Sequence, residues 1–111
     1  MEVSVSSDRQ GGLATVAVSG DVDLSTAPAV EQAVATAVAG EGVTAVEVDL
    51  SGVGFLDSSG IALLLKGRRA ADERGVAYRV TGVHGIAQQV LEMTGVWTHL
   101  VGGSGQNQPM P

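Results

Sequence analysis

The fold is decided by Val43-Thr44-Ala45-Val46-Glu47-Val48-Asp49-Leu50 and, a few residues later, by Asp57-Ser58-Ser59-Gly60-Ile61-Ala62-Leu63-Leu64-Leu65. The first stretch alternates in polarity, which is typical of a strand with one buried face. The second places two serines before an apolar run, which predicts a helix over residues 58–74. A loop over residues 51–57 is expected between them. The sequence therefore predicts a strand that feeds directly into a helix.

The segments on either side continue the alternation of strands and helices. The N-terminal part predicts two strands joined by the turn Gln10-Gly11-Gly12, then a break at Gly20–Asp23 and a helix that starts near Ser25 or Thr26 and ends at Gly40 and Gly42. After Gly75, the pattern predicts a strand over 76–80, a helix over 84–94 and a short edge strand over 97–101. Strands that alternate with helices require parallel pairing and right-handed crossovers.

These elements predict an α/β fold in a single domain. A mixed sheet of four to five strands is expected, with an N-terminal hairpin and with three to four helices packed on it. We expect the domain to span residues 1–101. Residues 102–111 are rich in Gly, Ser, Gln and Pro and carry no periodicity, so a disordered C-terminal tail is expected there.

Composition excludes several classes of function. The net charge of −6 and the three aromatic residues argue against nucleic acid or an anionic membrane as the main partner. The absence of cysteine excludes disulfides and thiol catalysis. The longest unbroken apolar run, Ile61–Leu65, is far shorter than a membrane span. A soluble, cytoplasmic protein without a cofactor is expected.

The charges are unevenly distributed along the chain. Nine of the twelve acidic residues lie in residues 1–57, where Arg9 is the single base. Two interpretations stay open. The acids can simply form solvated faces, or they can form an acidic face that meets a basic patch on a protein partner.

Ser58 is the main candidate for a functional residue. The simplest interpretation makes it only the N-cap of the following helix, with Ser59 beside it. Asp57 directly before it and Gly60 shortly after it favour a site prepared for modification. A phosphate on Ser58 would add about −1.5 to −2 charges at a helix N-terminus and beside Asp57. Such a change would alter the surface potential more than the fold.

Asp21 and Asp23 form a second candidate group. They can be no more than a polar turn between a strand and a helix. The alternative interpretation places them on the same rim as the Ser58 loop, where they would accept a hydrogen bond from a serine or contact a kinase-bound metal.

Catalytic motifs are missing from the chain. Gly-x-Ser-x-Gly is absent around Ser58, and His84 and His99 have no metal-ligand spacing. We therefore expect no intrinsic catalysis and no metal site.

Three segments together resemble the STAS domain family, specifically its small stand-alone bacterial anti-sigma factor antagonists. They are Gly20–Asp23 with Ser25–Ala27, Val48–Ser51 with Phe55–Gly60, and Leu91–Val96. The resemblance covers roughly residues 3–101.

The resemblance implies a partner-switching cycle. The unphosphorylated protein would bind an anti-sigma factor that is itself a serine kinase and so release the sigma factor. Phosphorylation would fall on Ser58 and switch binding off, and a serine phosphatase would restore it. By the same resemblance Asp23 and Ser59 would border the phosphosite, and Gly60 would open the helix beneath it. A monomer or weak dimer is expected. The alternatives are an unregulated STAS scaffold in a sensory or lipid-transport complex and, as a third class, a serine hydrolase.

Overall fold

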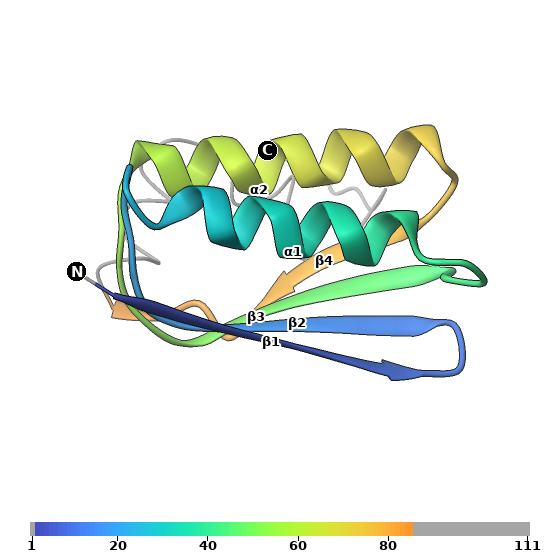
Figure 1. Ribbon diagram of the computed structural model, residues 1–111, viewed down its shortest axis with the longest axis horizontal. Helices are drawn as coiled ribbons and strands as arrows, with labels where there is room; N and C mark the ends of the chain where they lie inside the picture. Colours follow the sequence, from blue (N-terminus) through green and yellow to red (C-terminus); the bar gives the residue numbers. More distant parts are fainter. Residues whose placement is uncertain (1, 86–111) are drawn as a thin grey trace, which may run out of the picture.

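The computed structural model describes residues 2–85 as one mixed sheet covered on one face by two helices (Figure 1). In chain order the elements are β1 (Val3–Gln10), β2 (Leu13–Val22), α1 (Ala27–Ala39), β3 (Ala45–Leu56), α2 (Ser58–Glu73) and β4 (Ala77–Thr81). The predicted α/β fold with a mixed sheet is confirmed.

The strands lie in the order β1-β2-β3-β4. β1 and β2 form the predicted antiparallel hairpin, closed by Gly11 and Gly12, while β2, β3 and β4 run parallel to one another. Each parallel connection crosses through a helix, as parallel strands require. Both crossovers place their helix on the same face, so α1 and α2 lie side by side above the sheet (Figure 1).

The core fills the space between the helices and the sheet. It is dominated by Val and Leu, which fit the pleated surface of strands and the single apolar stripe of each helix. Fully buried side chains come from every layer and include Val16, Val30, Val34, Val48, Leu50, Leu56 and Leu64. The one ion pair between the two described helices, Lys66 Nζ to Glu31 Oε2 at 2.6 Å, is exposed and contributes little to stability.

β3 is longer than the sequence predicts, because the expected loop over residues 51–57 is strand as far as Leu56. Two register shifts against β2 explain the error. At the first shift, a single residue of β2 lies opposite two residues of β3, Leu50 and Ser51. At the second shift, Gly54 is the extra residue of β3. Each bulge inserts one residue, so Leu50, Val53 and Leu56, spaced by three, all face the core. Similarly, the expected break at Gly20 is wrong, because β2 continues to Val22.

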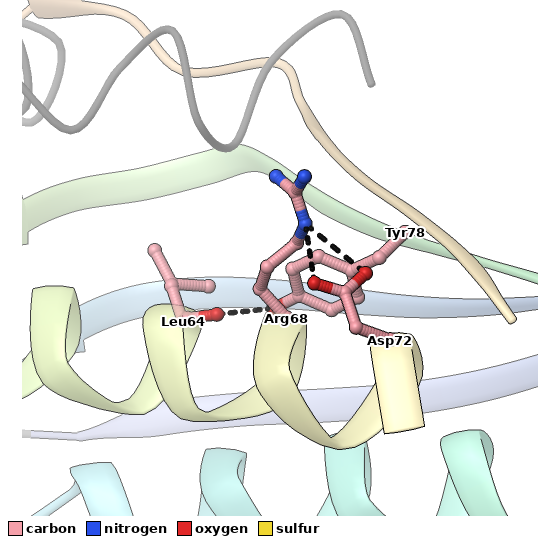
Figure 2. Close-up of polar contacts among 4 residues, drawn as sticks. All are labelled: Leu64, Arg68, Asp72 and Tyr78. Atoms are coloured by element: carbon pink, nitrogen blue, oxygen red, sulfur yellow. Dashed lines mark hydrogen bonds and ion pairs between the residues drawn. The ribbon is translucent and has the colours of Figure 1, made fainter. Parts of the chain in front are cut away.

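Buried Tyr78 of β4 ties the sheet to α2 (Figure 2). Its hydroxyl donates a hydrogen bond to the Leu64 carbonyl oxygen at 2.9 Å. On the next turn of α2, the guanidinium of Arg68 reaches the Asp72 carboxylate, with Nε 3.4 Å from Oδ2. Burial raises the pKa of Tyr78, and the Arg68 charge lowers it in part, so the hydroxyl stays protonated and keeps its donor role.

The expected helix over 84–94, the edge strand over 97–101 and the tail over 102–111 lie outside the described residues. The two helices that are described match the predicted ones, and Gly75 follows the end of α2 as expected. Neither of these helices has the length and apolar character needed to cross a lipid bilayer.

Candidate functional site

The candidate residues meet at the edge of the sheet where β2 and β3 end. These two strands are parallel neighbours, and their last residues, Val22 and Leu56, are paired. The backbone N–H of Asp57 donates a hydrogen bond to the Val22 carbonyl oxygen at 3.2 Å, and this bond joins the ends of β2 and β3. The chain turns up from both strands into α1 and α2 at this same edge, on the left of Figure 1. We call this edge, with Asp21, Asp23 and Asp57–Gly60, the acidic rim.

Asp57, rather than Ser58, is the N-cap of α2. Its backbone is extended, and its Oδ1 accepts hydrogen bonds from the N–H of Ser59 at 2.8 Å and of Gly60 at 3.4 Å. The prediction that Ser58 caps the helix is therefore wrong. Asp and Ser are about equally good caps, and the carboxylate adds a favourable charge at the positive end of the helix.

Ser58 is instead the first residue of α2 and is exposed to solvent. Ser59, the next residue, is half-buried. Because Asp57 already occupies the N–H groups of Ser59 and Gly60, a phosphate on Ser58 would not displace the cap. It would stand beside a carboxylate and add charge to the acidic rim.

Gly60 allows the start of α2 to lie close to the ends of β2 and β3. A Cβ atom at this position would lie 2.6 Å from Leu56 Cδ1 and 3.1 Å from Val22 Cγ1. Any larger residue would push the helix start, and Ser58 with it, away from the sheet. Gly60 is the third residue of α2 and does not open the helix, contrary to the prediction; its missing side chain lets the start of α2 pack on the ends of the strands.

Asp23 organises the loop between β2 and α1. Its Oδ1 accepts hydrogen bonds from the N–H of Ser25 at 2.9 Å and of Thr26 at 3.1 Å, and from the Ser25 hydroxyl at 2.8 Å. The buried Thr26 hydroxyl donates to the Asp21 carbonyl oxygen at 2.7 Å and accepts from the Asp23 N–H at 2.9 Å. Hydrogen bonds among its own residues therefore hold the loop in one conformation.

The Ser25 hydroxyl, and with it the backbone N–H groups of Ser25 and Thr26, holds the pKa of Asp23 below its ordinary value. Asp23 stays ionised at neutral pH. The expectation that Asp21 and Asp23 share a rim with the Ser58 loop matches their positions. The serine that Asp23 contacts is Ser25, from its own loop.

Leu24 is a feature of this edge that sequence reasoning missed. It sits between Asp23 and Ser25 and is 78% exposed, whereas Leu13, the other exposed large apolar residue in the described part of the chain, is 37% exposed. A leucine inside an otherwise polar turn was the available signal.

The described residues offer little for catalysis. His84 lies beside the bulge of β3, where its Nε2 is 2.9 Å from the Ser51 carbonyl oxygen. His99 falls beyond residue 85. Within residues 2–85, no three His, Asp or Glu side chains gather as metal ligands would.

Comparison with known proteins supports a family assignment. Residues 5–102 match the sequence model of a protein family described as "Mlab, STAS domain". A curated relative, the anti-sigma-F factor antagonist RsfB of Mycobacterium tuberculosis, is 39% identical over 62 residues, which are 56% of this chain and 50% of the relative. The chain thus spans about half the length of the curated relatives it matches.

Solved structures share the fold over most of their length. A crystal structure of an anti-sigma factor antagonist from Mycobacterium paratuberculosis superimposes with a TM-score of 0.78 and 30% identity, covering 89% of this chain and 83% of that one. The anti-sigma factor antagonist SpoIIAA in its unphosphorylated form superimposes with a TM-score of 0.73 and 17% identity, covering 88% and 86%. At that identity, the second likeness concerns the fold alone.

Proposed function

Because the chain belongs to the STAS domain family, we propose that it acts as an anti-sigma factor antagonist switched by phosphorylation of Ser58. In this proposal the unphosphorylated protein binds an anti-sigma factor that is a serine kinase, and the sigma factor is released. A serine phosphatase reverses the modification. The protein itself performs no catalysis and works in the cytoplasm, without direct contact to nucleic acid or membrane.

One observation carries the proposal: an exposed serine stands at the first position of α2, beside a cap that does not depend on it. Modification of such a serine needs no unfolding and removes no hydrogen bond of the cap. The names of RsfB and of the anti-sigma factor antagonist from Mycobacterium paratuberculosis support the same function.

In this proposal, the change in charge on the acidic rim is what switches binding to the partner. Asp57 directly precedes Ser58 and is committed to the cap, and Asp21 and Asp23 lie at the end of the neighbouring strand, whose last residue is paired with Leu56. A phosphate would bring about −1.5 to −2 further charges to this edge. It would change the electrostatic potential that a partner meets by about 1.5 to 2 times the effect of one carboxylate, while the core stays as it is. Binding is therefore the property that modification changes most.

A binding experiment tests the switch. Ser58→Ala is expected to bind the cognate anti-sigma factor as wild type does, and Ser58→Asp is expected to bind at least tenfold more weakly, as measured by calorimetry. The matched control is Ser59→Asp, which adds the same charge one residue along, at a half-buried position of α2. Equal affinity of Ser58→Ala and Ser58→Asp would contradict the switch and favour an unregulated scaffold.

The modification site is tested separately by intact-mass analysis. After incubation with ATP and the cognate kinase, the wild type and Ser59→Ala are expected to gain one phosphate, and Ser58→Ala none. A phosphate on Ser58→Ala would assign the modification to another residue.

A further inference from the structure

We propose that Leu24 is an apolar anchor that inserts into a pocket on the anti-sigma factor, and that this pocket is bordered by basic side chains. This inference rests on the proposed function and adds to it the residue that carries apolar binding energy. It is drawn from the position of Leu24 on the acidic rim and from the way its loop is built.

The exposure of Leu24 is a fixed property of the loop. Leu24 lies between Asp23 and Ser25, whose side chains are hydrogen-bonded to each other at 2.8 Å. The next residue, Thr26, is buried and bonded to both Asp21 and Asp23. These contacts hold the backbone on both sides of Leu24 while its side chain stays 78% exposed. Presentation in one conformation lowers the entropic cost of binding.

The location of Leu24 points to the partner that Ser58 controls. Val22 and Leu56 are paired at the ends of two adjacent strands. Leu24 lies two residues beyond Val22, and Ser58 lies two residues beyond Leu56. Both therefore project from the same edge of the sheet. A protein that is sensitive to charge at Ser58 covers this edge and meets Leu24 as well.

The charges around Leu24 define the chemistry of the complementary surface. The acidic rim contributes the carboxylates of Asp21, Asp23 and Asp57, and hydrogen bonding keeps Asp23 ionised. An apolar side chain that projects from an acidic edge is matched by an apolar pocket bordered by Lys and Arg. The charges then steer association, and burial of Leu24 slows dissociation.

The test uses the purified anti-sigma factor kinases of the source organism, each titrated with the full-length protein. For the kinase that binds, Leu24→Ala is expected to weaken affinity by about tenfold to a hundredfold, the range that burial of one leucine provides. Leu24→Met should retain near wild-type affinity, since it keeps the apolar volume. The matched control is Leu13→Ala, at the opposite end of β2, which should leave affinity unchanged.

Two further readouts separate an anchor from a structural role. The melting temperature of Leu24→Ala should equal that of the wild type, because the side chain is mostly in solvent. The loss should also persist at high salt, where the contribution of the acidic rim is screened. If Leu24→Ala binds like the wild type while Ser58→Asp binds weakly, the anchor is overturned and the proposed function stands. If no anti-sigma factor kinase binds the wild type, both are overturned.

Discussion

Replacing Asp57 with alanine is expected to destabilise the fold, whereas replacing Ser58 with alanine is expected to leave stability unchanged. The two residues are neighbours in the chain, and both types are good helix caps. In the structure, however, only Asp57 occupies the N-cap position of α2, and Ser58 is its first helical residue. The pair of variants therefore tests which of them the helix depends on.

The expected cost for Asp57→Ala follows from the geometry of the cap. Its Oδ1 makes one short hydrogen bond, 2.8 Å to the Ser59 N–H, and one long one, 3.4 Å to the Gly60 N–H. Loss of such a cap costs about 1 kcal/mol, and loss of the negative charge at the helix N-terminus adds about 0.3–1 kcal/mol. A free energy of unfolding lowered by about 1–2 kcal/mol is expected.

Thermal and urea unfolding followed by circular dichroism measure this loss. Each kcal/mol should lower the melting temperature by roughly 4–8 °C in a domain of this size. Asp57→Asn keeps the hydrogen-bond acceptor and loses only the charge, so it should fall between Asp57→Ala and the wild type. A Ser58→Ala variant as unstable as Asp57→Ala, or an Asp57→Ala variant as stable as the wild type, would refute this assignment of the cap.

Three further outcomes are expected. Gly67→Ala should lower stability by about 1–3 kcal/mol in urea unfolding, although alanine favours helices, because its Cβ would lie 2.7 Å from Tyr78 Oη; a more stable variant would contradict this packing. Tyr78→Phe should cost about 1 kcal/mol through loss of the 2.9 Å hydrogen bond to Leu64, and an unchanged unfolding midpoint would count against that bond. The pKa of Asp23 is lowered in the folded state, chiefly by Ser25, so its stabilising contribution is complete above the ordinary value of 3.8 and is lost as the pH falls through the folded-state pKa. Asp23→Asn should therefore show a smaller loss of stability between pH 5 and acid than the wild type, as followed by unfolding at each pH; equal slopes would exclude this linkage.

The order of the elements could be predicted from the sequence because hydrophobic periodicity reports local structure well. The end of β3 could not, because its inward residues Leu50, Val53 and Leu56 are spaced by three, which matches neither a regular strand nor a helix. Two bulges correct that spacing, and they depend on pairing with β2, which is distant in the chain. Ser51 and Gly54 read locally as loop residues for the same reason.

At the candidate site, the sequence predicted which residues share one edge of the sheet better than it predicted which of them caps α2. The ends of two parallel strands meet at one edge, so Asp23 and Ser58 could be placed together from topology alone. The choice of cap could not be made, because Asp57 and Ser58 differ by one position and only the backbone conformation decides between them. For Leu24, the polar turn around it marked the residue but not its exposure, since an apolar residue in a short turn can point inward or outward without any change in pattern.

The separation between the cap and Ser58 has an evolutionary consequence. Asp57 supports the helix, and Ser58 occupies the exposed position beside it. A single codon change at Ser58 can then remove the hydroxyl while the gene product keeps its fold. Duplicated copies of such a gene are free to diverge at this position without passing through an unstable intermediate.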